Sequence, residues 1–163
     1  MREGDLAPDI ELATDRGDTF RLSSLRGKKV VLYFYPRAST PGCTTEACEF
    51  RDASAEFERR NAVIIGVSPD RPAAQQKFKA NHDLPFTLLC DVDKSAAEAY
   101  GVWKEKNMYG KKTMGIERTT FLIAEDGRIA KIFPKVKAKG HAAQVLAALD
   151  AEPHGGQSTA TAS

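Results

Sequence analysis

The chain has 163 residues, of which 42% are hydrophobic and 28% are charged, and its formal net charge at pH 7 is +2. These values suit one ordinary globular domain. Lys and Arg are scattered among Asp and Glu, and no apolar run approaches the roughly 18 residues of a membrane span, so neither a nucleic-acid partner nor a membrane is expected. The charged N-terminal segment lacks an apolar signal core, which predicts a cytoplasmic location.

Strand-like and helix-like segments alternate along the chain. In order, we expect a buried strand at 30–35, a helix at about 44–60, a strand at 62–67, a helix at 72–81, a strand at 86–90, a short helix at 93–101, a hairpin at 119–133 and a helix at 140–150. This order predicts an α/β sandwich with a mixed sheet, since strand–helix–strand units make parallel pairs and the hairpin adds antiparallel ones. Residues 1–150 should form one domain, and the small, polar segment 151–163 should be disordered.

Two of the three cysteines, Cys43 and Cys48, follow the first predicted strand in the stretch "YPRASTPGCTTEACEFRD". Thiols in the cytoplasm are normally reduced, so a close pair indicates redox chemistry or metal binding rather than a structural disulfide. Cys43 should lie at or just inside the start of a helix, where unpaired N–H groups favour an anion such as a thiolate. Thr40 offers a hydroxyl within reach of that sulfur. The alternative is that Cys43 is simply a small buried hydrophobic residue.

Cys48 lies five residues after Cys43. In one intact helix their Cα atoms would be about 8.7 Å apart, too far for a disulfide, so a bond between them requires the first helical turns to unwind. The pair therefore predicts a conformational switch coupled to oxidation, although Cys48 could instead face the core and never react. A zinc site would need about four ligands, and no histidine has ligand spacing with the pair. Cys90 ends an apolar strand, and we interpret it as a core residue.

The spacing P-x-x-x-T-x-x-C, formed by Pro36, Thr40 and Cys43, resembles the active-site motif of peroxiredoxins. The longer "TPGCTTEACEFRD" is similar to the Q-type, or bacterioferritin-comigratory-protein, subfamily. The resemblance continues in "GVSPD", "LLCD", "YGVWKEKNMYGKKTMGIERTTFLI" and "DGRI", and covers roughly residues 1–150. It implies a thioredoxin-like three-layer sandwich with helices on both faces of a central mixed sheet.

The resemblance also implies roles for single residues. Cys43 would be the peroxidatic cysteine and Cys48 the resolving one, with Thr40 and Arg118 orienting the peroxide and Glu46 in a supporting structural role. The expected substrate is hydrogen peroxide or an organic hydroperoxide, and thioredoxin or a similar dithiol protein is the expected reductant. No metal, haem or flavin cofactor is implied. Because both cysteines lie in one chain, we expect a monomer.

Two other functions fit part of the pattern. A thioredoxin-like disulfide oxidoreductase would share the fold, but it would normally carry C-x-x-C rather than a four-residue spacer. A redox sensor or chaperone could use the same cysteine switch without turnover. Peroxide consumption, disulfide reduction and cycling with thioredoxin distinguish the three.

Overall fold

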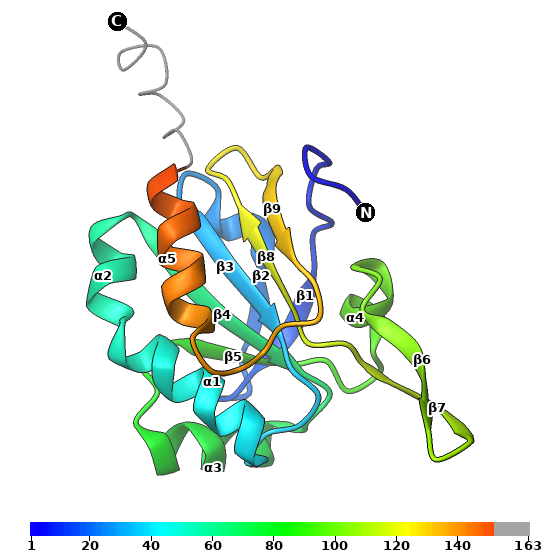
Figure 1. The fold of residues 1–163 in the computed structure, drawn as a ribbon. Helices are drawn as coiled ribbons and strands as arrows, with labels where there is room; N and C mark the ends of the chain where they lie inside the picture. Colours follow the sequence, from blue (N-terminus) through cyan, green and yellow to red (C-terminus); the bar gives the residue numbers. More distant parts are fainter. Residues whose placement is uncertain (152–163) are drawn as a thin grey trace, which may run out of the picture.

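Figure 1 shows the computed structural model, which describes residues 1–151 apart from the side chain of Met108. The strands are β1 (Glu11–Thr14), β2 (Thr19–Arg21), β3 (Lys29–Phe34), β4 (Ala62–Ser68), β5 (Thr87–Cys90), β6 (Trp103–Met108), β7 (Lys111–Ile116), β8 (Thr119–Ile123) and β9 (Ile129–Phe133). The helices are the 3-10 helix η1 (Leu22–Leu25), α1 (Pro41–Asp52), α2 (Ser54–Arg59), α3 (Pro72–His82), α4 (Ser95–Ala99) and α5 (His141–Ala151).

Within the described residues, seven strands form one sheet in the order β2-β1-β5-β4-β3-β8-β9. The central strands β5, β4 and β3 are parallel, and the outer strands pair antiparallel with their neighbours. The predicted mixed sheet is therefore confirmed. Its parallel part comes from the strand–helix–strand order, and β8–β9 is the hairpin expected at 119–133.

Both faces of the sheet are covered, so every residue of β3 is buried. Val31 and Tyr33 point into a core shared with α1, α2, α3 and α5. Val30, Leu32 and Phe34 point into a second core, shared with α4, η1 and the N-terminal segment. This alternation follows from the period of two along a strand, and it confirms the three-layer arrangement.

The predicted helix at 44–60 is wrong in one respect, because the structure has two helices there. The chain leaves helical geometry at Ala53, which has φ −98° and ψ 4°, and α2 then packs on β4. Asp52 and Ser54 flank the break, and both residue types form local hydrogen bonds that compete with a helix. The short helix expected at 93–101 is also shorter, spanning only Ser95–Ala99.

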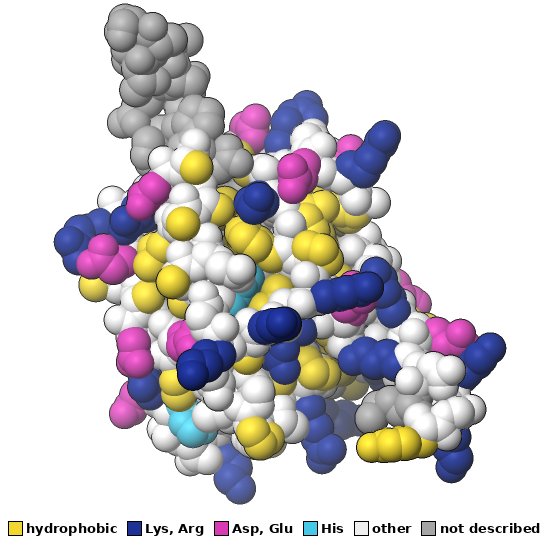
Figure 2. All heavy atoms as spheres, in the orientation of Figure 1, with side chains coloured by type: hydrophobic (Ala, Val, Ile, Leu, Met, Phe, Trp, Pro, Cys, Tyr) yellow, Lys and Arg dark blue, Asp and Glu magenta, His cyan; other side chains and the backbone are white. Residues whose placement is uncertain are grey.

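Two hairpins are absent from the sequence-based prediction. β1–β2 lies at one edge of the main sheet, while β6–β7 forms a separate ribbon that stands out from the body (Figure 1). Tyr109 and Gly110 have φ values of 53° and 79° at the tip of this ribbon, as a primed hairpin turn requires. Its strands are rich in charged residues, so they lack the apolar alternation on which the prediction depended. Figure 2 shows Lys and Arg side chains on this projection, and both signs of charge intermingled over the rest of the visible face.

The predicted disordered segment 151–163 lies outside the described residues, except for Ala151, which is the last residue of α5. No helix within residues 1–151 combines the length and the apolar character needed to cross a bilayer.

Candidate active site

The segment between β3 and α1 carries the predicted reactive region. Tyr35 extends the strand, since its amide still bonds to β4, and the backbone then turns sharply. Ser39 is left-handed with φ 66°, and Thr40 returns to an extended conformation with φ −84° and ψ 156°. α1 starts directly afterwards, so Cys43 lies in its first turn, where unpaired N–H groups gather.

Arg118 lies against the sulfur of Cys43. Its Nη2 atom donates to Cys43 Sγ at 3.4 Å, and its Nη1 atom donates to Oε1 of Glu46 at 2.7 Å. Arg118 immediately precedes β8, whose first residue Thr119 pairs with Phe34 at the end of β3. The antiparallel register therefore brings Arg118 to the start of α1 from 75 residues away in sequence.

The three groups share a desolvated site. Cys43 is 1% exposed and Glu46 is fully buried. Burial raises the pKa of Glu46 from 4.5 to about 7, and the guanidinium of Arg118 only partly offsets this effect. For Arg118, burial alone would lower the pKa, but the attraction of Glu46 and Cys43 outweighs burial and raises it. The guanidinium is thus a fixed cation, held by a carboxylate on one side and available to the sulfur on the other.

Tyr33 is buried in the same core as Cys43 and lies close enough to interact electrostatically with Cys43, Glu46 and Arg118. Within residues 1–151, Tyr33 Oη and Glu46 Oε2 are the buried side-chain polar atoms that have no hydrogen-bond partner. The pKa of Tyr33 is well above its usual value because of burial, with further contributions from Tyr35, Glu46 and Cys43. Tyr33 therefore stays protonated and neutral. Cys43 and Tyr33 are both 1% exposed, and such buried surroundings strengthen the interaction of the sulfur with Arg118.

Thr40 and Pro36 lie on the loop ahead of the helix. The Thr40 hydroxyl donates to Arg37 O at 2.9 Å, and it does not cap α1. The Thr40 carbonyl accepts from Thr44 N at 2.9 Å, so its backbone is tied into the first helical turn. Pro36 is half-buried at the end of the strand extension. The structure thus brings Cys43, Arg118 and Glu46 into direct contact and places Thr40 and Pro36 beside them in the chain.

Cys48 lies in the same helix as Cys43, and both cysteines are free thiols. Cys48 is half-buried. The residues after it are anchored: Glu49 accepts from Gly140 N at 2.8 Å, ahead of α5, and Arg51 donates to His82 O at 2.8 Å, at the end of α3. The first turns of α1 lie between these anchors and the loop.

Cys90 behaves as the sequence predicts for a core residue. It is buried at the end of β5, and burial, with smaller contributions from Asp15 and Asp70, raises the pKa of its thiol to about 11. No cluster of three or more His, Cys, Asp or Glu side chains that could hold a metal occurs in residues 1–151.

A buried polar network next to the loop has no counterpart in the sequence-based prediction. It consists of Ser68, the last residue of β4, and Asp70 just after it, together with Gln75 of α3 and Tyr35. The only related signal in the sequence is "GVSPD", which forms part of the family resemblance but predicts no role for these side chains.

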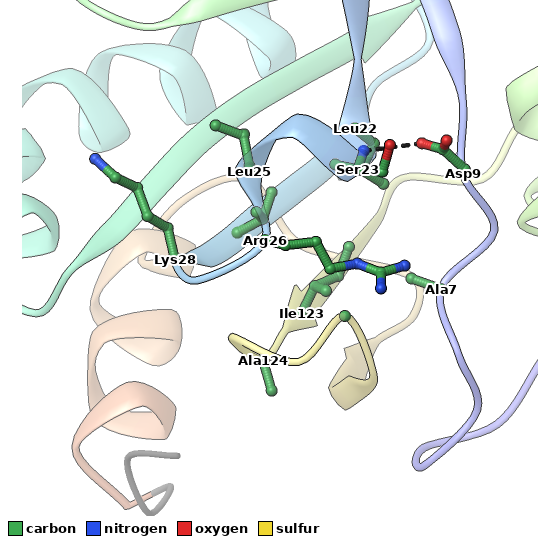
Figure 3. A pocket seen from close by; sticks show the side chains of 11 residues that line it. Ala7, Asp9, Leu22, Ser23, Leu25, Arg26, Lys28, Ile123 and Ala124 are labelled. Atoms are coloured by element: carbon green, nitrogen blue, oxygen red, sulfur yellow. Dashed lines mark hydrogen bonds between the residues drawn. The ribbon is translucent and has the colours of Figure 1, made fainter. Parts of the chain in front are cut away.

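A cavity of about 20 Å³ lies at the opposite end of the sheet (Figure 3). Arg26 reaches toward Ala7 there, and the carboxylate of Asp9 accepts from Ser23 N at 2.8 Å. Its lining contains no cysteine, so this end lacks the nucleophile found at the start of α1.

Comparisons with known proteins agree with this geometry. Residues 4–132 match the AhpC/TSA family. The chain is 55% identical over 146 residues to peroxiredoxin Bcp of Bacillus subtilis, covering 90% of this chain and 93% of that protein. It superposes with a TM-score of 0.84 and 43% identity on the bacterioferritin comigratory protein of Xanthomonas campestris, studied for alkyl peroxide reduction, covering 87% and 90% of the two chains.

A PrxQ variant of Xylella fastidiosa gives a TM-score of 0.87 at 38% identity, covering 93% of this chain and 96% of that one. These neighbours confirm the thioredoxin-like fold that the sequence motifs implied. The chain therefore belongs to the AhpC/TSA family: it is a peroxiredoxin of the Q-type, or Bcp, subfamily, an oxidoreductase that reduces peroxides.

Proposed function

We propose that the Cys43 thiolate performs the peroxide reduction. Its sulfur attacks the distal oxygen of hydrogen peroxide or an alkyl hydroperoxide, the O–O bond breaks, and water or an alcohol leaves while Cys43 becomes a sulfenic acid. The observation that carries this proposal is the 3.4 Å contact from Arg118 Nη2 to Cys43 Sγ in the first turn of α1. A guanidinium and a helix N-terminus both favour the thiolate over the thiol.

Arg118 and Thr40 orient the peroxide. Negative charge moves from the sulfur to the departing oxygen during the reaction. The Arg118 guanidinium can stabilise this charge without moving, because Glu46 already holds it in place. The Thr40 hydroxyl donates to Arg37 O, which leaves its lone pairs free to accept the O–H of the peroxide. Pro36 sets the direction in which the loop leaves the strand, since its ring fixes φ.

Cys48 resolves the sulfenic acid. Its thiolate attacks the oxidised sulfur of Cys43, the S–O bond breaks, hydroxide leaves and takes up a proton to become water, and an intramolecular disulfide forms. In the intact helix the two residues are separated by about 7.5 Å of rise, so the first turns of α1 must unwind. That step breaks the contacts of Arg118 with Cys43 and Glu46, while the anchors after Cys48 hold the rest of α1.

Thioredoxin, or a similar dithiol protein, then reduces the disulfide by exchange. Because the bond lies within one chain, the cycle needs no second subunit, and we propose a monomer. A cytoplasmic location supplies the reducing thiols that this cycle requires.

Rapid mixing of reduced protein with one equivalent of hydrogen peroxide tests this mechanism. The expected product, by intact mass and peptide mapping, is a Cys43–Cys48 disulfide. Cys43→Ser should abolish rapid oxidation, and Cys48→Ser should consume about one equivalent and then fail to cycle with thioredoxin. Cys90→Ser is the matched control and should behave like the unmodified protein. Rapid oxidation that persists in Cys43→Ser would contradict the mechanism, and full cycling of Cys48→Ser would assign resolution to another thiol.

A further inference from the structure

The loop that carries Thr40 is held from outside by a carboxylate. Oδ2 of Asp70 accepts from the backbone N–H of Ala38 at 2.7 Å, and it also accepts from Ser68 Oγ at 2.6 Å. Ala38 is 7% exposed, so its N–H has little access to water and depends on the carboxylate for a partner. An ionised acceptor makes such a bond short and strong. Asp70 is therefore the main external restraint on the middle of the loop.

The carboxylate is itself fixed by a buried network. Ser68 is 1% exposed and Gln75 is fully buried. Gln75 Nε2 donates to Ser68 Oγ and to Leu89 O, both at 2.9 Å, while Gln75 Oε1 accepts from Tyr35 Oη at 2.6 Å. The network thus joins β4, β5 and α3 to both Tyr35 and Ala38, at the start and the middle of the loop.

The restrained loop contains an unfavourable backbone conformation. Ser39, the residue after Ala38, has φ 66°, a left-handed conformation that is unfavourable for a non-glycine residue. That conformation turns the chain so that Thr40 becomes the N-cap and Cys43 falls in the first helical turn. Without the bond to Ala38 N, Ser39 could relax to negative φ, and the start of α1 would shift.

We propose that Asp70 is a positioning residue, which holds the loop so that Thr40 and the first turn of α1 face the site of peroxide attack. This proposal rests on the proposed peroxidase mechanism. Asp70 does not touch the sulfur; it acts through Ala38 and the turn at Ser39. The network sets the geometry of the loop, and Arg118 sets the charge at the sulfur.

Three variants and a control test the proposal. Asp70→Ala removes the acceptor, and Asp70→Asn keeps one acceptor oxygen for Ala38 N. The double variant Asp70→Ala/Ser39→Gly makes positive φ at position 39 easy. Asp126→Ala is the matched control: Asp126 Oδ1 also accepts a backbone N–H, from Arg128 at 3.0 Å, but in the distant β8–β9 turn.

Asp70→Ala should lower kcat/KM for hydrogen peroxide by about ten- to a hundredfold, because the attacking geometry is lost. It should also slow alkylation of Cys43 by iodoacetamide and speed hydrogen exchange in residues 38–43. Asp70→Asn and the double variant should recover most of both properties. Asp126→Ala should leave the reactivity of Cys43 unchanged.

Unchanged kcat/KM and exchange in Asp70→Ala would overturn the proposal. So would equal losses of activity in Asp70→Ala and Asp126→Ala, or failure of Ser39→Gly to restore any activity. If Asp70→Ala does not fold, Ser68→Ala removes one support of the carboxylate, and the same comparison applies with a smaller effect. Alkylation and exchange do not need peroxide, so an inactive unmodified protein would refute the peroxidase mechanism and leave the test of Asp70 intact.

Discussion

Arg118 and Arg26 lie at opposite ends of the central sheet, and each lies against a glycine. A Cβ atom on Gly42 would come within 3.1 Å of Arg118 Nη2, and one on Gly127 would come within 2.7 Å of Arg26 Nε. Arg118 has a buried carboxylate and a sulfur as partners, whereas Arg26 borders a small cavity without a nucleophile (Figure 3).

The difference shows what an arginine needs to assist chemistry. A guanidinium interacts more strongly with a reacting anion when it is desolvated, when another anion fixes its position and when one N–H edge is left unused. Glu46 and the register of β8 with β3 supply these conditions at Arg118. A change at the site can therefore be compared with the matching change at the other end of the sheet.

Arg118→Ala should have the largest effect. Loss of the guanidinium removes the charge that stabilises both the thiolate and the departing oxygen, so peroxide consumption should slow by about 10²–10³-fold. Stopped-flow peroxide kinetics measure the rate.

Arg26→Ala is the control at the opposite end, and it should leave the peroxide rate unchanged. Arg118→Lys keeps the charge but lacks the planar guanidinium that can bond Glu46 and Cys43 at once. Its rate should therefore fall between those of the alanine variant and the unmodified protein. Equal rates in Arg118→Ala and Arg26→Ala would show that the contact with the sulfur has no catalytic role.

Glu46→Gln should change the pH dependence. Because the pKa of Glu46 rises from 4.5 to about 7 on folding, the protonated form favours the folded state, and this contribution to stability is lost as pH rises through 7. Gln cannot titrate. The free energy of unfolding of the variant, relative to the unmodified protein, should therefore rise by roughly 3 kcal/mol between pH 4 and 8, as urea titrations would measure.

The same substitution should affect activity above pH 7, where the ionised carboxylate holds Arg118. There the variant should be slower by about tenfold, and below pH 6 the two rates should converge. Parallel pH profiles, with no difference in slope across this range, would show that Glu46 does not titrate in the folded protein.

The sequence predicted the parts of this site that are local. An apolar strand, a turn-rich loop and a helical pattern place Cys43 at a helix start, and the spacing to Cys48 excludes a bond within an intact helix. Arg118 gave no local signal, because its contact spans 75 residues and depends on the antiparallel register of β8; only the family resemblance pointed to it. The complete burial of Glu46 could not be predicted from the sequence either, since a glutamate in a helix is usually exposed.

The errors in the fold have the same origin. The β6–β7 ribbon is rich in charged residues and meets a core only at its base, where Ile116 is buried and Trp103 packs against the second core, so the apolar patterns that identified the main strands did not mark it. After the break at Ala53, α2 packs on β4, and helical periodicity does not encode such a tertiary contact.

Among the changes at the active site, Gly42→Ala should have the smallest effect on the peroxide rate. Comparing it with the same change at Gly127 distinguishes the two ends of the sheet. Gly42 lies in α1, where Ala is the better helix former, so stability should stay the same or rise slightly. The new methyl group displaces Arg118 Nη2, however, and the peroxide rate should fall by about three- to tenfold.

Gly127→Ala should do the opposite. Gly127 has φ 88°, which an alanine tolerates poorly, so the protein should lose about 1–2 kcal/mol of stability and keep its peroxide rate. Thermal melts and stopped-flow kinetics on both variants measure the two effects. If Gly42→Ala keeps full activity, the guanidinium can shift by a few tenths of an ångström without loss, and its charge rather than its exact place is what the sulfur requires.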